Sequence, residues 1–199
     1  MKAARGAAAS LLLPLLLVTG LTSCSASAGP EPASRPSAVP ASGGTPAPSG
    51  DPTDSAWVQL MIPMDEQAVS LLALAAKKAT DPQLRSWATG LRTAQDAELT
   101  ALRGLRDRMG LPATDVHAGH NMPGMVTAED LAQAGTAEGA PFDRFLVVQI
   151  RDHLRQSAQV SRSEITAGSR TDAKERAKAL VTAREGQLAV MDALAGNGS

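Results

Sequence analysis

Apolar side chains recur every three or four residues in four long segments of this chain, a spacing typical of one face of an α-helix. In the first pair of segments the recurring side chains are Trp57, Met61, Met64, Ala68, Leu71, Leu72 and Ala75, then Leu84, Trp87, Leu91, Ala94, Leu102, Leu105 and Met109. In the second pair they are Phe142, Leu146, Ile150, Leu154 and Ala158, then Ala179, Leu180, Ala183, Leu188, Met191 and Leu194. No segment alternates apolar and polar residues between turn signals, as a half-buried strand would. The pattern predicts four long helices and an all-α fold.

The lengths of the connections indicate how these helices pair. Asp81-Pro82 marks a short break between the first two helices, because Asp is a good N-cap and Pro fits the first helical position. Short connections predict one helical hairpin over residues 55–110 and another over residues 141–196, with residues 111–126 as the longer loop between them. Two hairpins joined in this way predict a four-helix bundle over residues 55–196.

The two hairpins are predicted to be copies of one unit. Residues 60–69 recur in altered form as residues 148–157, at an offset of 88, and residues 91–99 recur as residues 180–188, at an offset of 89. Two echoes in the same order at nearly the same offset indicate a duplication, which either echo alone would not. The hairpins are therefore expected to be related by a pseudo-twofold axis.

The first residues are typical of a lipoprotein signal peptide. Lys2 and Arg5 precede an almost wholly apolar run over residues 7–21, which at about 15 residues is shorter than the roughly 20 that span a bilayer. The run ends in Leu-Thr-Ser-Cys, which resembles a bacterial lipobox, in which the cysteine is lipidated and becomes the first mature residue. We therefore predict a signal peptide over residues 1–23 and an extracytoplasmic protein anchored to the bacterial cell membrane through Cys24. The alternative is an ordinary signal peptide in which Cys24 is incidental.

Residues 24–54 are predicted to be a disordered tether. Residues 25–55 hold seven of the thirteen prolines and several Gly and Ser, and Val39 is the only large aliphatic residue among them. Such a segment cannot bury enough apolar surface to offset the entropy lost on ordering. The tether is expected to hold the folded domain off the membrane and to end at Asp54, the expected cap of the first helix.

Composition and charge narrow the range of functions. The formal net charge is −1, no basic block is present, and the chain has two Trp, two Phe and no Tyr, so nucleic acid is not an expected partner. Cys24 is the only cysteine, which excludes an internal disulfide and a thiolate metal site. No arrangement of nucleophile and base stands out, nor does a glycine-rich phosphate loop. The protein is therefore not expected to be an enzyme.

The interhairpin loop carries the side chains best suited to metal chemistry. His117, His120, Met122 and Met125 fall within nine residues, and the Gly and Pro between them let the chain bend. Imidazole and thioether ligands suit Cu(I), so the loop predicts a copper site and a role in copper sequestration or handling. The alternative is that the loop is a linker in which these histidines and methionines are incidental.

A second candidate site lies at duplicated positions inside the predicted bundle. The framework there consists of Met61-Ile62-Pro63, Ala68, Gln95 and Glu98 in the first repeat, and Phe142-Asp143, Phe145-Leu146, Ile150, His153 and Met191 in the second. With these residues the chain resembles the secreted bacterial family named domain of unknown function 305. The resemblance covers about residues 55–194, and it implies a ferritin-like helical bundle with a metal site between its helices.

The resemblance implies which side chains would face that metal. Where the family carries His-His pairs, this chain has Met64-Asp65 in the first repeat and Asp152-His153 in the second. His153 is thus the one histidine that remains of the family pattern. A bundle metal would be bound by Asp65, Glu98, Asp152 and His153 on the resemblance alone.

Arg184 changes what the bundle interior is expected to hold. It stands in the second repeat where the first has Gln95, and a cation there would repel a metal ion. Arg184 is predicted to form a buried ion pair with Asp152, with Asp65 or Glu98 as alternative partners, so that side-chain charge replaces metal charge. Two functions therefore stay open. One is an envelope lipoprotein that binds copper through its loop, and the other is a metal-free structural or partner-binding bundle whose ancestral site has been lost.

Overall fold

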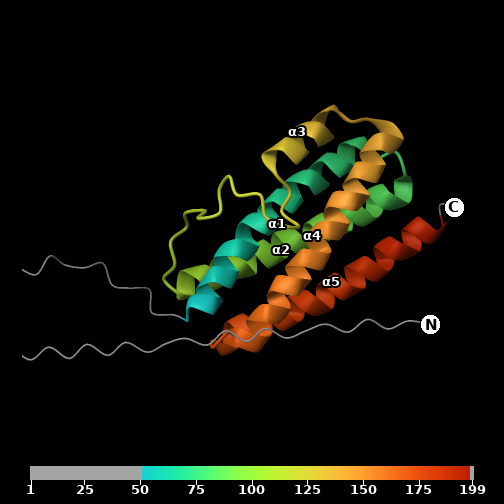
Figure 1. Ribbon diagram of the computed structural model, residues 1–199. Helices are drawn as coiled ribbons and strands as arrows, with labels where there is room; N and C mark the ends of the chain where they lie inside the picture. Colours follow the sequence, from blue (N-terminus) through green and yellow to red (C-terminus); the bar gives the residue numbers. More distant parts are fainter. Residues whose placement is uncertain (1–50, 198–199) are drawn as a thin grey trace, which may run out of the picture. The chain divides into compact units, whose positions relative to one another are not determined.

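The computed structural model of this protein describes residues 51–197. Within this range the chain forms no strand and five helices, namely α1 (Pro52–Lys78), α2 (Pro82–Arg108), α3 (Ala128–Thr136), α4 (Gly139–Ala167) and α5 (Thr171–Asn197) (Figure 1). The prediction of an all-α bundle is confirmed. The predicted signal peptide, Cys24 and the predicted tether up to residue 50 lie outside the described residues.

Two long hairpins make up the bundle. Helix α1 packs along α2, α4 packs along α5, and the hairpins meet mainly through α1 and α4. Helices α2 and α5 touch only sparsely, and the short helix α3 packs against α1 and α4 (Figure 1). No helix among residues 51–197 is both long enough and apolar enough to cross a bilayer.

Helix α1 begins earlier than the apolar pattern predicts. Asp51 is its N-cap, since Asp51 Oδ1 accepts the N–H of Thr53 at 2.7 Å and Pro52 takes the first helical position. Asp54, the predicted cap, lies in the first turn and is fully buried. The pattern followed only apolar positions, which begin after Asp54, so it placed the start of the helix too late.

Asp54 instead ties the two hairpins together. Its carboxylate accepts the N–H groups of Ser169 at 3.0 Å and Arg170 at 3.2 Å, so a side chain of α1 caps the chain just ahead of α5. Gly168 makes room for this contact, because a Cβ there would lie 2.7 Å from Asp54 Oδ1. Glu164 is buried against the same carboxylate. The burial of Glu164, together with the neighbouring Asp54, raises the pKa of Glu164 to about 8.

Two apolar clusters fill the bundle, and a polar layer separates them. One cluster includes Leu71, Leu72, Leu91, Phe142, Leu146, Ile150 and Met191. The other includes Trp57, Met61, Met64, Leu102, Leu105 and Leu180. Between them along the helices lie the fully buried polar side chains Asp65, Gln95, His153, Ser157 and Arg184. Because buried polar groups need partners, the contacts within this layer decide what the bundle centre can do.

Candidate functional site

Arg184 of α5 occupies the middle of the buried polar layer. Its Nη2 donates to Asp65 Oδ1 at 3.0 Å and to Glu98 Oε1 at 2.6 Å. Its Nη1 donates to Glu98 Oε2 and to Gln187 Oε1, both at 3.2 Å, and its Nε donates to Ser157 Oγ at 2.8 Å. Glu98 is therefore held by two parallel hydrogen bonds, and side chains from all four long helices meet at one guanidinium.

The predicted ion pair between Arg184 and Asp152 is wrong. Asp152 is exposed, and the ion-pair partners of Arg184 are Asp65 and Glu98, the two alternatives that the sequence offered. Successive residues of a helix point about 100° apart, and His153 faces the interior of the bundle. Asp152 therefore points toward solvent, where its carboxylate needs no buried partner.

One guanidinium faces two carboxyl groups in this layer, so a proton is needed to make the layer neutral. Burial raises the pKa of Asp65 well above its usual range, Arg184 opposes the rise, and the neighbouring Glu98 carboxyl adds to it. Asp65 Oδ2 is buried and has no hydrogen-bond partner among the described residues. We interpret Asp65 as the carboxyl group that carries this proton, because a second buried negative charge beside one cation would stay unpaired.

His153 of α4 lies in the same layer and is fully buried. Its Nε2 is 2.9 Å from Gln95 Nε2 and 3.5 Å from Asp65 Oδ1. Burial, and then the charge of Arg184, lower the pKa of His153 to about 3, while the Gly124 backbone opposes the shift. Nδ1 makes no hydrogen bond of ordinary geometry with any residue in the range 51–197. Nε2 of the neutral ring is thus engaged by the Gln95 amide within the layer.

The contacts in the layer follow the predicted duplication. At an offset of 88 Asp65 matches His153, and at an offset of 89 Gln95 matches Arg184. Asp65 of α1 contacts Arg184 of α5, and His153 of α4 contacts Gln95 of α2. In each case the first helix of one repeat contacts the second helix of the other repeat. Such reciprocal contacts are what a twofold relation produces.

The bundle centre does not fit the metal that the family resemblance implies. Asp65, Glu98 and His153 come together as predicted, but Arg184 bonds to both carboxyl groups, and the exposed Asp152 takes no part. Within the described part of the chain, no group of three or more His, Cys, Asp or Glu side chains is placed to hold a metal ion. A metal cation would have to displace a guanidinium that already pairs with both carboxyl groups.

The interhairpin loop contains two tight turns in succession. In the first, the N–H of His120 donates to the carbonyl of His117 at 2.9 Å, and Gly119 has a φ of +77°. A positive φ at the third position is what a type II turn requires, and glycine adopts it without strain. The carboxylate of Asp115 accepts the N–H of His117 at 2.8 Å and fixes the start of the turn. The two imidazoles are neighbours, with ring centroids 6.3 Å apart.

The second turn repeats this geometry with methionines. The N–H of Met125 donates to the carbonyl of Met122 at 3.0 Å, and Gly124 has a φ of +72°. Pro123 at the second position and glycine at the third are the favoured pair for a type II turn. Each turn thus carries two side chains of one ligand type at its ends. The sequence signal for both turns is His-Ala-Gly-His followed by Met-Pro-Gly-Met, which the spacing of the ligands alone does not reveal.

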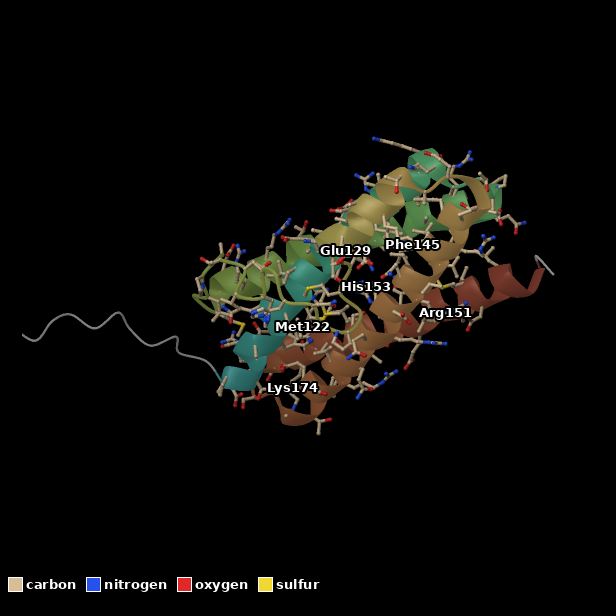
Figure 2. The ribbon with its side chains drawn as sticks, turned by 45° about the horizontal axis from the view of Figure 1, so that its top comes forward. Met122, Glu129, Phe145, Arg151, His153 and Lys174 are labelled. Carbon is tan, nitrogen blue, oxygen red and sulfur yellow. The ribbon has the colours of Figure 1, made fainter. Side chains whose placement is uncertain are left out.

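A cavity of about 390 Å³ lies beside the two turns. His117, His120 and Met125 line it, together with residues of α1 and the first residues of α3. Met122 does not line the cavity. It is half-buried, and Figure 2 shows it between the outer arch of the loop and His153 of α4. The structure therefore brings three of the four predicted loop ligands to one space, with the fourth at the other end of the methionine turn.

The sequence model of the family described as Domain of unknown function (DUF305) matches residues 54–195. The chain belongs to the DUF305 family. A DUF305 protein from Streptomyces coelicolor shares the fold, with a TM-score of 0.64 at 22% identity over 74% of this chain and 94% of that one. A DUF305 fragment from Deinococcus radiodurans has a TM-score of 0.66 at 18% identity, over 74% of this chain and 98% of that one.

A third solved structure of the same fold is CopM in its Cu(I)-bound form. Its TM-score to this DUF305 chain is 0.62 at 18% identity, over 74% of this chain and 98% of CopM. No curated protein matches the chain significantly. The family resemblance seen in the sequence is thus confirmed, whereas identities this low carry over the fold and not the site.

Proposed function

We propose that this DUF305 protein is a non-enzymatic copper-binding protein of the cell envelope, and that its interhairpin loop holds the metal. The observation that carries the proposal is the pair of turns, which places His117, His120 and Met125 around one cavity. Met122, at the start of the methionine turn, is the fourth candidate ligand. The proposed role is to sequester copper or to pass it on.

The chemistry of the loop favours copper over other metals. Thioether sulfur is a soft ligand that selects Cu(I), and imidazole suits copper as well. His117 is half-buried and His120 is exposed, so both rings can turn toward a metal without disrupting a packed core. No Lys or Arg is among the residues that line the cavity, so no side-chain cation competes there as Arg184 does in the bundle centre.

Proteins of the same fold support copper as the metal. CopM has been solved in a Cu(I)-bound form and in a Cu(II)-bound form, with TM-scores to this chain of 0.62 and 0.56. The identities of 18% and 16% are too low to transfer ligands residue by residue. The proposal for this chain therefore rests on its own loop, and the relatives show that the fold is compatible with copper.

A metal-free bundle with a structural or partner-binding role is the second candidate function. Arg184 favours it, because its hydrogen bonds to Asp65 and Glu98 fill the place at which the resemblance implies a metal. The two candidate functions differ only in what the loop does. A loop that binds no copper would leave the second candidate as the better account.

A Cu(I) competition titration against a chromophoric chelator of known affinity tests the proposal. We expect wild type to bind Cu(I) and His120→Ala/Met125→Leu to bind at least about tenfold more weakly, since even outer-shell partners of metal ligands are worth about 10–100-fold. Met109→Leu is the matched control, because Met109 is buried in the core and does not line the cavity. Equal binding by wild type and the double variant, or no binding by either, would mean that the loop is only a linker.

The envelope location in this proposal rests on the leader sequence. The apolar run and the Leu-Thr-Ser-Cys motif predict export and lipidation of Cys24, and the relative from Streptomyces coelicolor is described as a candidate secreted protein. An exported protein meets copper without the glutathione that keeps cytosolic thiols reduced. Cell fractionation tests the anchor: Cys24→Ala should move the protein from the membrane fraction to the soluble fraction, and continued membrane retention would refute lipidation.

A further inference from the structure

The outer half of the interhairpin loop makes hydrogen bonds only within itself, among the residues that the structure describes. Residues 112–121 are exposed, apart from the half-buried His117. Their hydrogen bonds to other described residues are local, from the N–H of His117 to Asp115 and from the N–H of His120 to His117. The histidine turn can therefore change its position relative to the helices without breaking a hydrogen bond to them, and His117 is its only side chain that is partly buried.

The inner half of the loop, from residue 122 onward, is fixed to the helices together with the first turn of α3. Val126 is 1% exposed and belongs to the apolar cluster that α1, α2 and α4 share. Thr127 and Asp130 form a reciprocal capping box at the start of α3. Gln149 of α4 donates to Asp130 at 3.2 Å. Packing and hydrogen bonds therefore both hold the chain that follows the methionine turn.

Gly124 is the point at which the methionine turn meets α4. A Cβ added to Gly124 would overlap the side chain of Gln156 and would lie 2.9 Å from the carbonyl oxygen of Asp152. Only a residue without a side chain lets the turn approach the helix this closely. The same stretch of α4 carries His153, which the Gly124 backbone also reaches, and Figure 2 shows Met122 on this side of the molecule.

We propose that the copper loop is built from a fixed half and a closing half. Gly124 seats the turn of residues 122–125 on α4 and so holds the thioethers in place before the metal arrives, and the turn of residues 117–120 then folds onto the metal from the solvent side. This inference rests on the proposed function. Gly124 is a positioning residue here, because it acts through Met122 and Met125, and ligands that are pre-organised lose less freedom on binding.

Gly119 provides a matched control for Gly124. Both glycines take the third position of their turns, with φ values of +77° and +72°, so alanine is strained to a similar extent at either position. Nothing lies within 4 Å of a Cβ added to Gly119, whereas a Cβ added to Gly124 meets α4. The two alanine variants therefore differ in whether the turn can stay on the helix.

Cu(I) competition titrations of the two variants test the role of Gly124. We expect Gly124→Ala to weaken binding at least about tenfold more than Gly119→Ala, as the loss of a supporting contact does at other metal sites. X-ray absorption of the Cu(I)-loaded protein should show fewer sulfur scatterers in Gly124→Ala and unchanged nitrogen scatterers. Equal weakening in the two variants, or wild-type affinity in Gly124→Ala, would overturn the inference and leave the copper site itself in place.

Hydrogen exchange of the metal-free full chain tests, without copper, whether Gly124 holds the methionine turn against α4. The N–H of Met125, which is bonded to Met122, should exchange at least about tenfold faster in Gly124→Ala than in wild type or Gly119→Ala, because local opening sets its protection. Circular dichroism should show the same helix content in all three proteins. Unchanged exchange of the Met125 N–H in Gly124→Ala would contradict the role of Gly124 in holding the turn on α4. If wild type binds no copper, the proposed function is wrong, and so is the proposed closure of the histidine turn onto the metal. The exchange data would then still test whether Gly124 holds the methionine turn on α4.

Discussion

The bundle centre and the interhairpin loop both gather side chains that proteins use to bind metals, but their lone pairs are occupied differently. Asp65 and His153 have no exposed side-chain surface and Glu98 has 11%, and both carboxyl groups accept hydrogen bonds from Arg184. The loop ligands that line the cavity face no such cation. The comparison teaches that ligand-type residues form a metal site only where their lone pairs remain free, and that proximity alone is insufficient.

Burial explains why the two regions differ. Two carboxyl groups in a low-dielectric interior need a compensating charge and hydrogen bonds, and Arg184 supplies its charge and three donated hydrogen bonds to them. Neutral imidazoles and thioethers need no compensating charge, so they can stand partly exposed without a metal. The side chains of the bundle centre are therefore fixed by one another, whereas the proposed loop ligands are not held by a buried ion pair.

The largest effect is expected from removing the cation of the bundle centre. Arg184→Met would leave Asp65 and Glu98 buried without a positive charge. Breaking a buried ion pair in this way costs about 3–5 kcal/mol, so urea titrations at neutral pH should show the free energy of unfolding lowered by that amount. This loss of stability should grow as the pH rises, because the buried carboxyl group that had been paired with Arg184 is then less able to become neutral by taking up a proton.

Two control variants separate this effect from the loss of any charge. Arg162→Met removes an exposed ion pair with Glu185, which is worth about 0–1 kcal/mol. Asp152→Asn removes an exposed carboxylate and should change stability by less than about 0.5 kcal/mol. An Arg184→Met protein as stable as wild type, or an Asp152→Asn protein as unstable as Arg184→Met, would erase the contrast between the bundle centre and the surface.

Apolar periodicity predicted most of the fold, because it depends only on local spacing. Apolar periodicity also held the signal that Asp152 is not a partner of Arg184. Ile150 and Leu154 are fully buried, so the interior face of α4 passes through His153 and leaves Asp152 on the opposite side. An ion pair assigned from sequence neighbours alone ignores this phase, and for that reason Asp152 was the wrong partner.

The features that the sequence could not predict depend on contacts between distant segments. The spacing of the loop ligands predicts that they can converge, but Gly124 looks like any turn glycine until α4 is placed beside it. Asp54 likewise looks like an ordinary helix cap, yet it accepts a hydrogen bond from the backbone of Ser169, 115 residues away. Both features depend on tertiary packing, which a local sequence pattern cannot predict.

A smaller effect, confined to acid, is expected at His153. Its pKa in the folded protein is about 3, lowered first by burial and then by Arg184, compared with about 6.5 for a histidine in an unfolded chain. Between these two values the unfolded chain binds a proton that the folded protein does not bind. The contribution of His153 to stability is therefore complete above about pH 6.5 and is lost as the pH falls toward 3.

NMR of the His153 ring shows directly whether the bundle imidazole is sealed. We expect its ring chemical shifts to stay constant from pH 8 down to about pH 4, because burial disfavours the charged ring. His153→Gln, which keeps a neutral polar side chain, should reduce the loss of stability between pH 6.5 and 4 relative to wild type. A midpoint near 6.5 for His153 would instead show an imidazole that is open to solvent and protons. The bundle centre would then hold an accessible imidazole, as the proposed loop site does, and the distinction between the two regions would fail.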